Sequence, residues 1–438
     1  MTAGENAERT FSVCPVCLKR LPALRADRGD AVTLERTCRE HGFFSAPIWR
    51  KRLDFKEWTE DAARLTDGGN PDCPSACGLC ASHIRDTCCV LLEVTHKCDL
   101  GSCRFCFAGA PRESEPTRGQ ISAWLRMIVR SGETFLQLSG GEPTTRDDLP
   151  EIVAEARRLG CKYIQLNSNG IRLAEEPDYA QALAARGLSF VFLQFDGVND
   201  DIYRHLRGRE MLELKERAIQ SCGRAGIGVT LVPTVVRGVN DGMLGDIVRF
   251  GVARSPAVRG VHFQPACYLG RTPRDISDYD RITIDELLEE LYRQCGSAVP
   301  RGSLRPSSCD HPLCGFHAGF VALEGGALYS LNRDERRNGD CRADASARSR
   351  EFIGRRWSRP SAACRASPNH AAAKDAGELT DLDSFLAGSK NHSFTISGMA
   401  FQDAGNLDLE RLASCSLHVF RDGAMVPFCA RYLTPLAT

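Results

Sequence analysis

Six short apolar runs that alternate with amphipathic stretches limit the folds open to this chain more than any other feature. The runs cover residues 90–95, 134–139, 163–167, 190–195, 229–235 and 261–265. Helical periodicity predicts helices at 149–159, 178–186, 212–225 and 284–295. Near-continuous apolar strands separated by helices form a parallel sheet with helices on its outer side. Six units are too few for a complete eight-stranded barrel, so the sequence predicts an α/β fold with a partial (β/α)6 barrel.

Polar and glycine-rich residues follow directly after these runs. They occupy 98–106, 140–142, 168–170, 196–197, 237–238 and 270–271. The carboxyl ends of parallel strands meet at one edge of a sheet, where such proteins build their sites. We therefore expect these segments to line one shared pocket.

The 21 cysteines among 438 residues indicate metal binding. An odd number of cysteines without a secretion signal argues against a disulfide framework, because cytosolic thiols are kept reduced. Residues 1–6 lack the basic and apolar regions of a signal peptide, and no apolar run is long enough to span a bilayer. We expect a cytoplasmic protein. Zero formal net charge and the lack of a basic–aromatic pattern disfavour nucleic acid as a partner.

The loop after the first run carries Cys98, Cys103 and Cys106. Three thiolates in one short loop can hold three irons of a [4Fe–4S] cluster and leave the fourth iron open. A zinc knuckle is the alternative, but it requires a fourth protein ligand, and none is obvious nearby. The second run is followed by Gly140, Gly141 and Glu142. The glycines allow a ligand to approach the backbone, and the carboxylate can pair with an ammonium group.

Together, the cysteine loop and the Gly-Gly-Glu-Pro-Thr segment one strand later resemble the radical S-adenosylmethionine (SAM) superfamily. The resemblance implies that Cys98, Cys103 and Cys106 ligate the cluster, and that residues 140–142 recognise the amino group of methionine. It also implies reductive cleavage of SAM to a 5′-deoxyadenosyl radical. The family usually spaces its cysteines C-x3-C-x2-C, whereas four residues separate the first two here. Because glycine adopts turns at little steric cost, we expect the pair at 101–102 to absorb the extra residue.

Further candidates for SAM binding follow the third and fourth runs. Ser168 and Asn169 end the third strand, where the family often contacts the carboxylate or ribose of SAM, and Gln194 ends the fourth strand on the same face. Asn-Gly and Asp-Gly pairs are also ordinary turn formers, so turn chemistry is the alternative for these positions. Phe107, directly after the third cysteine, completes the predicted cofactor-binding set.

Two further knuckles precede the barrel. Cys14-x2-Cys17 and Cys38-x2-His41 are separated by twenty residues, a spacing typical of a tetrahedral site for zinc or for a mononuclear, rubredoxin-like iron. A Cys3His set favours zinc, whereas the neighbouring clusters admit iron. Such a site has no open position and is expected to be structural.

The remaining cysteine groups are predicted to hold one or two auxiliary [4Fe–4S] clusters. Cys73, Cys77 and Cys80 have the usual radical SAM spacing but precede the first strand, and no Gly-Gly-Glu segment follows at the right distance. The C-terminal third contributes four further predicted ligands, Cys309, Cys314, Cys415 and Cys429. Cys161, Cys222 and Cys295 lie within helical or strand patterns and are predicted to be small buried side chains.

Several ordered motifs are similar to those of the tetraether lipid synthase group, to which a dihydro-hydroxymethylpterin dimethyltransferase also belongs. These motifs lie at 73–83, 309–314, 399–404, 408–411 and 427–429. The resemblance implies an enzyme that attacks an unactivated carbon, and we expect C–C bond formation on lipid alkyl chains. The alternatives are radical methyl transfer to a pterin or another small heteroaromatic, and, from a different class, a non-catalytic iron–sulfur electron carrier.

The predicted organisation has four parts. Residues 1–60 form the metal knuckle, 61–88 an auxiliary-cluster segment, 89–300 the radical SAM partial barrel, and 301–438 a C-terminal auxiliary-cluster domain with a flexible linker at 333–392. The expected partners are a small-molecule or lipid substrate and an external one-electron reductant such as flavodoxin or ferredoxin. Basic residues within 333–356 leave a peripheral membrane contact open, although charge runs are usually solvated surface.

Overall fold

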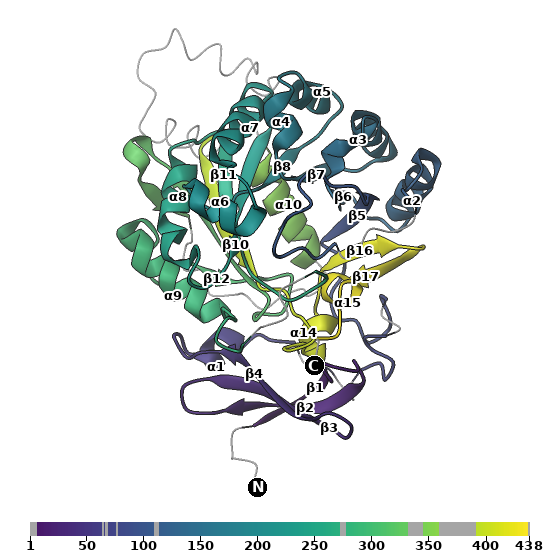
Figure 1. Ribbon diagram of the computed structural model, residues 1–438, viewed down its shortest axis with the longest axis vertical. Helices are drawn as coiled ribbons and strands as arrows, with labels where there is room; N and C mark the ends of the chain where they lie inside the picture. Colours follow the sequence, from purple (N-terminus) through teal and green to yellow (C-terminus); the bar gives the residue numbers. More distant parts are fainter. Residues whose placement is uncertain are drawn as a thin grey trace.

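A computed structural model of the chain describes residues 7–63, 65, 69–75, 78–108, 114–271, 277–331, 345–358 and 391–436. Within these ranges the strands form a small N-terminal sheet and one large sheet (Figure 1). The small sheet is antiparallel, in the order β1 (Glu8–Val13), β2 (Arg20–Asp27), β3 (Val32–Cys38) and β4 (Gly42–Trp49).

The six predicted runs form neighbouring parallel strands in the order of the sequence, which confirms the partial barrel. They are β5 (Cys89–Thr95), β6 (Phe135–Gly140), β7 (Tyr163–Ser168), β8 (Phe190–Gln194), β9 (Gly228–Val232) and β11 (Val258–Pro265), with the short β10 (Thr234–Val235) beside β11. Alternate side chains point to opposite faces of each strand. On β5, Val90 and Leu92 join the core beneath the helices, whereas Leu91 lines a cavity on the other face.

Helices cover the outer face of this sheet. They are α2 (Arg118–Arg130), α3 (Leu149–Leu159), α4 (Ile171–Glu175), α5 (Tyr179–Ala185), α6 (Asp200–Arg207), α7 (Leu212–Arg224), α8 (Leu244–Val252) and α9 (Ile284–Cys295). Cys161 and Cys222 are buried in the core as predicted, and Cys295 is partly buried against it.

The C-terminal third extends the barrel sheet at both edges. At one edge, β15 (Ser393–Met399) pairs with β11 in parallel, and β13 (Gly315–Ala322) follows it antiparallel with the short β12 (Arg305–Pro306) and β14 (Leu328–Ser330). At the other edge, β16 (Leu417–Arg421) pairs with β5, followed by β17 (Ala424–Pro427). The chain between β15 and β16, which includes α14 (Leu409–Ala413), therefore runs from one edge of the barrel to the other. Residues 301–438 were predicted as a C-terminal auxiliary-cluster domain, and their described strands lie in the same sheet as the barrel strands.

In the described part of the predicted linker 333–392 there is one helix. This helix, α10 (Ala345–Trp357), contacts the amino ends of several barrel strands, and most of the linker lies outside the described residues. Tyr163 at the start of β7 donates from its hydroxyl to Glu351, across 3.0 Å. Arg259 in β11 donates from Nε to the carbonyl oxygen of Arg356, across 2.8 Å. The helix therefore closes the end of the barrel opposite the polar strand ends.

The N-terminal sheet packs against the C-terminal segment. Arg25 forms buried ion pairs with Asp408 (2.7 Å) and Glu410 (2.6 Å). The short α1 (Phe55–Thr59) follows this sheet, and Trp49 packs against its Phe55 at a ring-centroid distance of 5.8 Å. Across the part of the chain that the structure describes, no helix is both long and apolar enough to span a bilayer.

Candidate functional site

The cysteine loop is fastened to the neighbouring strand end by backbone hydrogen bonds. The amide of Gly141 donates to the carbonyl of Thr95 (2.9 Å), and the amide of Glu142 donates to the carbonyl of Lys97 (2.7 Å). A Cβ atom at Gly140, where φ is +130°, would lie 2.1 Å from the carbonyl oxygen of Thr95. A Cβ at Gly141 would lie 2.0 Å from that of Lys97. Glycine is therefore required at both positions for the two strand ends to meet.

The predicted cluster ligands and SAM contacts line one cavity of about 680 Å³. This cavity includes all three loop cysteines and all seven predicted cofactor-binding residues, namely Phe107, Gly140, Gly141, Glu142, Ser168, Asn169 and Gln194. Three thiols that face one space are the donor set that a [4Fe–4S] cluster with one open iron requires. The residues present therefore fit the group implied by the sequence.

Glu142 joins three loops at the mouth of the barrel. Its carboxylate accepts hydrogen bonds from the amide and hydroxyl of Thr144 (3.1 and 2.7 Å), the hydroxyl of Ser168 (2.9 Å) and the amide of Asn169 (2.6 Å). Burial raises the pKa of this carboxyl, and the four donors act in the opposite direction. Asn169 in turn donates from Nδ2 to Asp99 in the cysteine loop, across 2.6 Å. Glu142 and Asn169 are thus hydrogen-bonded directly to the loop, and Ser168 is connected to it through Glu142.

Gln194 belongs to a buried charged network that the sequence did not reveal. Its Oε1 accepts from Nζ of Lys215 (2.8 Å), and its Nε2 donates to Asp196. Asp196 also pairs with Arg207 through two hydrogen bonds of 2.7 and 2.8 Å. Burial lowers the pKa of Lys215 to about 7. The network fixes the amide of Gln194 at the edge of the cavity.

Aromatic side chains cover the cysteine loop from the C-terminal side. Phe107 packs against Phe428 and Tyr432, with ring-centroid distances of 5.2 and 4.9 Å. Phe428 begins the short α15 (Phe428–Arg431), and the hydroxyl of Tyr432 donates to Glu93 on β5 (3.0 Å). These contacts bring the C-terminal segment against Phe107, and Phe107 and Phe428 form part of the cavity wall.

The far end of the cavity combines aromatic rings with polar atoms. Phe192 packs against Trp357 of α10 at 4.7 Å and against His262 at 5.5 Å. Nδ1 of His262 lies 2.9 Å from the hydroxyl of Ser397, and burial lowers the pKa of this histidine to about 4, which keeps it neutral. Nε1 of Trp357 and Oγ1 of Thr395 are buried, and neither has a hydrogen-bond partner among the described residues.

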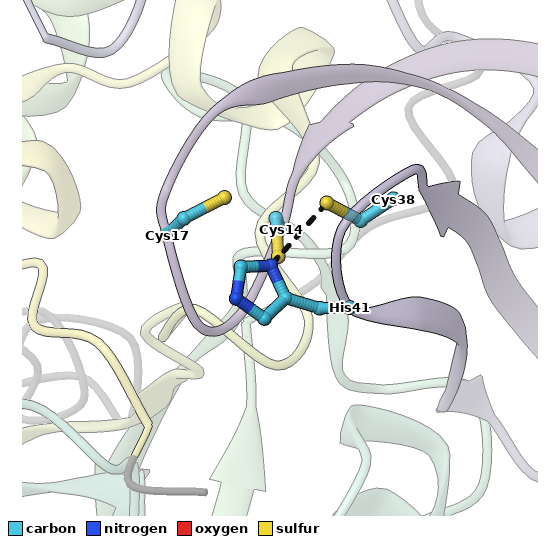
Figure 2. Close-up of side chains that lie close together, drawn as sticks. All are labelled: Cys14, Cys17, Cys38 and His41. Carbon is cyan, nitrogen blue, oxygen red and sulfur yellow. Dashed lines mark hydrogen bonds between the residues drawn. The ribbon is translucent and has the colours of Figure 1, made fainter.

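The N-terminal knuckle brings its four predicted ligands together (Figure 2). Cys14 and Cys17 lie at the β1–β2 turn, and Cys38 and His41 at the β3–β4 turn. Nδ1 of His41 lies 3.6 Å from the sulfur of Cys14 and 3.5 Å from that of Cys38, and all four ligand atoms lie within 4.8 Å of one another. The His41 ring lowers the pKa of the Cys38 thiol to about 6, which favours the thiolate that a metal requires.

The predicted auxiliary ligands fall into separate groups. Cys314, Cys415 and Cys429 are close enough to act on one another electrostatically, and burial raises the pKa of all three. Cys309 instead interacts with Cys88, and both line the large cavity. Cys73 and Cys80 border a small hollow beside α14. Cys77 lies outside the described residues.

Sequence reasoning did not place four neighbours of these sites beside the cysteines. Cys88 lies beside Cys309, and Cys267 is close enough to Cys429 for that thiol to influence its pKa. Arg207 interacts with Cys103, and Arg271 with Cys106. The placement of Arg271 directly after the last barrel strand was the available signal for this residue, because it lies with the other strand-end segments.

Comparisons with known proteins identify relatives of this chain. A sequence profile described as the radical SAM superfamily matches residues 92–251, and one described as the HMPTM N-terminal zinc ribbon domain matches residues 7–50. The chain is 31% identical to 7,8-dihydro-6-hydroxymethylpterin dimethyltransferase of Methanocaldococcus jannaschii, over 96% of this chain and 92% of that protein. It is also 31% identical to a probable GTP 3′,8-cyclase of Methanothermobacter thermautotrophicus, over 38% of this chain and 55% of that protein. Among solved structures, methylornithine synthase aligns with a TM-score of 0.40 and 14% identity, over 63% of this chain and 83% of that one.

Proposed function

The chain belongs to the radical SAM superfamily, and within it we propose an enzyme that transfers a methyl group from SAM to a carbon of a small heteroaromatic molecule. The chain is a radical SAM enzyme whose cofactors are a [4Fe–4S] cluster, SAM and a metal ion at the N-terminal knuckle. The full-length likeness to a protein named as a pterin dimethyltransferase supports methyl transfer over the lipid coupling expected from the sequence.

Cys98, Cys103 and Cys106 are the proposed ligands of the catalytic cluster. A cluster bound there supplies the electron that cleaves SAM and yields the 5′-deoxyadenosyl radical. The chain itself holds the loop in place through the backbone contacts of Gly141 and Glu142. Phe107, Phe428 and Tyr432 pack together directly after the third cysteine and hold that end of the loop in place.

SAM is proposed to lie across the carboxyl ends of β6, β7 and β8. There Glu142 orients Ser168 and the amide of Asn169, and Lys215 orients Gln194. Hydrogen-bonded side chains that cannot rotate bind a ligand with little further loss of conformational entropy. These residues therefore position SAM and leave the closed end of the cavity, beside Phe192 and Trp357, for the substrate.

The polar atoms at the closed end of the barrel carry the substrate assignment. Trp357 offers a buried N–H donor, and Thr395 a buried hydroxyl, neither with a partner among the described residues. Leaving such groups unpaired costs about 1–3 kcal/mol each. Once either side chain turns its polar atom toward the cavity, a planar heteroaromatic with ring nitrogens and exocyclic polar groups can bond to it and stack on Phe192, whereas an alkyl chain cannot form such a hydrogen bond.

Lipid C–C bond formation is the second candidate, because part of the cavity wall is apolar. Leu91, Ile353, Met399, Phe401 and Leu417 all line it. Side chains of this kind match an alkyl chain and offer no hydrogen bonds. The peripheral membrane contact belongs to this second candidate, and half of the basic segment on which it depends, residues 333–344, lies outside the described residues. The electron-carrier alternative is disfavoured, because the full-length relative is named as an enzyme.

The accessory metals are proposed to be structural or electron-transferring. For the knuckle, the Cys3His set and the zinc ribbon match favour zinc over mononuclear iron. For an auxiliary [4Fe–4S] cluster we propose Cys314, Cys415 and Cys429, with Cys267 as the fourth ligand. Cys73, Cys77 and Cys80 are proposed to hold a further auxiliary cluster. Cys309 and Cys88 line the large cavity itself. Reductive cleavage needs an external one-electron donor, for which flavodoxin or ferredoxin is proposed.

Isotopic labelling separates the two candidate reactions. Reconstituted, reduced enzyme is incubated with SAM carrying a ¹³C-methyl group and either a reduced pterin or an extract of membrane lipids. Methyl transfer uses two molecules of SAM for each methyl group: one is cleaved with one electron to 5′-deoxyadenosine and methionine, and the other gives its labelled methyl to the pterin and, with a second electron from the external donor, leaves as S-adenosylhomocysteine. Unlabelled, cross-linked lipid chains would replace this proposal with the second candidate. The Cys98→Ala, Cys103→Ala and Cys106→Ala triple variant serves as the control that cannot cleave SAM.

A further inference from the structure

The lengthened cysteine loop caps the carboxyl end of α6. The last four carbonyl groups of a helix have no partner within the helix. Two of them are satisfied here by the loop, because the amide of Arg104 donates to the carbonyl of Leu206 (3.1 Å) and the hydroxyl of Ser102 lies 2.5 Å from the carbonyl of Arg207. The two donors flank Cys103 on either side in the sequence.

The fit between the loop and α6 is tight. Gly208 follows the helix with φ of +79°, and a Cβ atom there would lie 3.0 Å from the hydroxyl oxygen of Ser102. The same hydroxyl lies 2.8 Å from the carbonyl of Leu100, so its single hydrogen is shared between the carbonyls of Leu100 and Arg207. The amide of Ser102 also donates to the Leu100 carbonyl and closes the turn inside the loop. Gly101 takes the left-handed conformation that this turn requires, with φ of +50°.

A second contact holds the other end of the loop. Cys106 and Arg271 form an antiparallel bridge, in which each amide donates to the other carbonyl (3.1 and 2.9 Å). A Cβ at Gly270 would lie 2.6 Å from the carbonyl oxygen of Phe107, so this pairing also depends on close backbone approach. Upstream, the amide of Tyr268 donates to the buried carboxylate of Asp403 (3.1 Å), which anchors this segment to the C-terminal chain.

At each of these two backbone contacts, an arginine side chain also interacts with a cysteine of the loop. Arg207, fixed by its two hydrogen bonds to Asp196, interacts with Cys103, and Arg271 interacts with Cys106. Each contact thus combines a backbone attachment with a cation beside one sulfur.

We propose that Ser102 is a positioning residue: it fastens the four-residue Cys98–Cys103 spacing to α6, and with the Cys106–Arg271 pairing it sets the three sulfurs in place before the cluster binds. The inference rests on the proposed role of these three cysteines as cluster ligands. The additional residue is therefore an integral part of the site, and shortening the loop to the usual spacing removes the attachment to α6.

Deletion of Ser102 tests this inference directly. The deletion restores C-x3-C-x2-C, so a loop that merely tolerates its extra residue would still bind a cluster. We expect instead that the deletion variant loses the EPR signal that changes on addition of SAM, and that its iron content falls to that of the triple cysteine variant. Metal bound at the N-terminal knuckle, measured in the same sample, reports that the variant is folded.

Ser102→Ala keeps the loop length and removes only the hydroxyl. Loss of one or two hydrogen bonds corresponds to about a two- to tenfold faster loss of the SAM-responsive cluster under chelator challenge. Ser122→Ala is the matched control, because that serine donates to Glu155 (2.7 Å) on the outer helices and should leave the rate unchanged.

The outcomes distinguish this inference from the ligand assignment. A fully loaded, SAM-responsive cluster in the deletion variant, with no signal in the triple cysteine variant, would overturn the role of Ser102 alone. A SAM-responsive signal that survives in the triple variant would overturn the ligand assignment and the role of Ser102 with it. Loss in both variants, with faster loss in Ser102→Ala, supports the inference.

Discussion

The guanidinium of Arg25 donates from Nε to Oδ2 of Asp408 across 2.7 Å, although 383 positions separate the two residues in the chain. Asp408 is fully buried, and Arg25 is 3% exposed. Glu410 accepts a second hydrogen bond from the same guanidinium (2.6 Å), and Thr10 donates to Asp408 (2.9 Å). The ion pair therefore joins the N-terminal sheet to the chain segment that spans the two edges of the barrel.

Asp408→Asn should destabilise the protein by about 3 kcal/mol, because it removes one charge of a buried pair and leaves Arg25 incompletely compensated. The free energy of unfolding in urea measures this effect. Lys19→Met is the control, since the Lys19–Glu40 pair is exposed on both sides and its loss should change stability little. Equal stability of the two variants would contradict a buried anchor at this position.

Glu142→Gln should weaken SAM binding by about tenfold or more. The glutamine amide would place a donor against one of the four donors that now face the carboxylate, and a mismatched buried hydrogen bond costs about 1–3 kcal/mol. Equilibrium dialysis with labelled SAM measures the dissociation constant. Glu155→Gln is the matched control. Like Glu142, Glu155 accepts a hydrogen bond from a hydroxyl, and it also accepts one from a guanidinium, but it lies on the outer helices. An unchanged dissociation constant in Glu142→Gln would refute the role of this carboxylate.

Lys215→Met should change how stability depends on pH between about 7 and 10.5. Burial lowers the pKa of Lys215 to about 7 in the folded chain, from an ordinary value of 10.5. In this window the unfolded chain binds a proton at Lys215 that the folded chain does not, so the contribution of Lys215 to stability rises with pH. The wild type should gain up to about 1.4 kcal/mol per pH unit relative to the variant. Urea unfolding at pH 7.5, 8.5 and 9.5 measures this, and parallel curves for the two proteins would count against the shift.

The barrel could be predicted from the sequence because its signals are local. The predicted helices 149–159 and 284–295 have the same bounds as α3 and α9, since each begins and ends where its apolar periodicity does. Each predicted apolar run likewise corresponds to a strand, because buried parallel strands are apolar on both faces. The cysteine loop and Gly140–Glu142 meet in one cavity because both follow neighbouring strands.

The C-terminal pairing could not be predicted, because strands at opposite edges of a sheet carry no shared local pattern. β15 and β16 are separated by only 17 residues, yet they extend different edges of the barrel. For the same reason, the residues that lie beside the cysteines could not be predicted from the sequence. Arg207 ends α6, and no local sequence signal connects it with Cys103. The fold alone brings its guanidinium to that thiol.

Trp357→Phe separates a heteroaromatic substrate from an alkyl chain at the closed end of the cavity. The substitution keeps an aromatic ring beside Phe192 and removes the indole N–H, which has no partner among the described residues. A substrate that accepts a hydrogen bond from this donor should bind about three- to tenfold more weakly, whereas an alkyl chain should bind with unchanged affinity. Binding of a reduced pterin to the reconstituted enzyme, measured by equilibrium dialysis, checks the first expectation, and Thr395→Val should act in the same direction. Trp124→Phe, in the outer helix α2, is the control. Unchanged pterin affinity in both cavity variants would remove the hydrogen-bonding argument for a heteroaromatic and favour the lipid substrate.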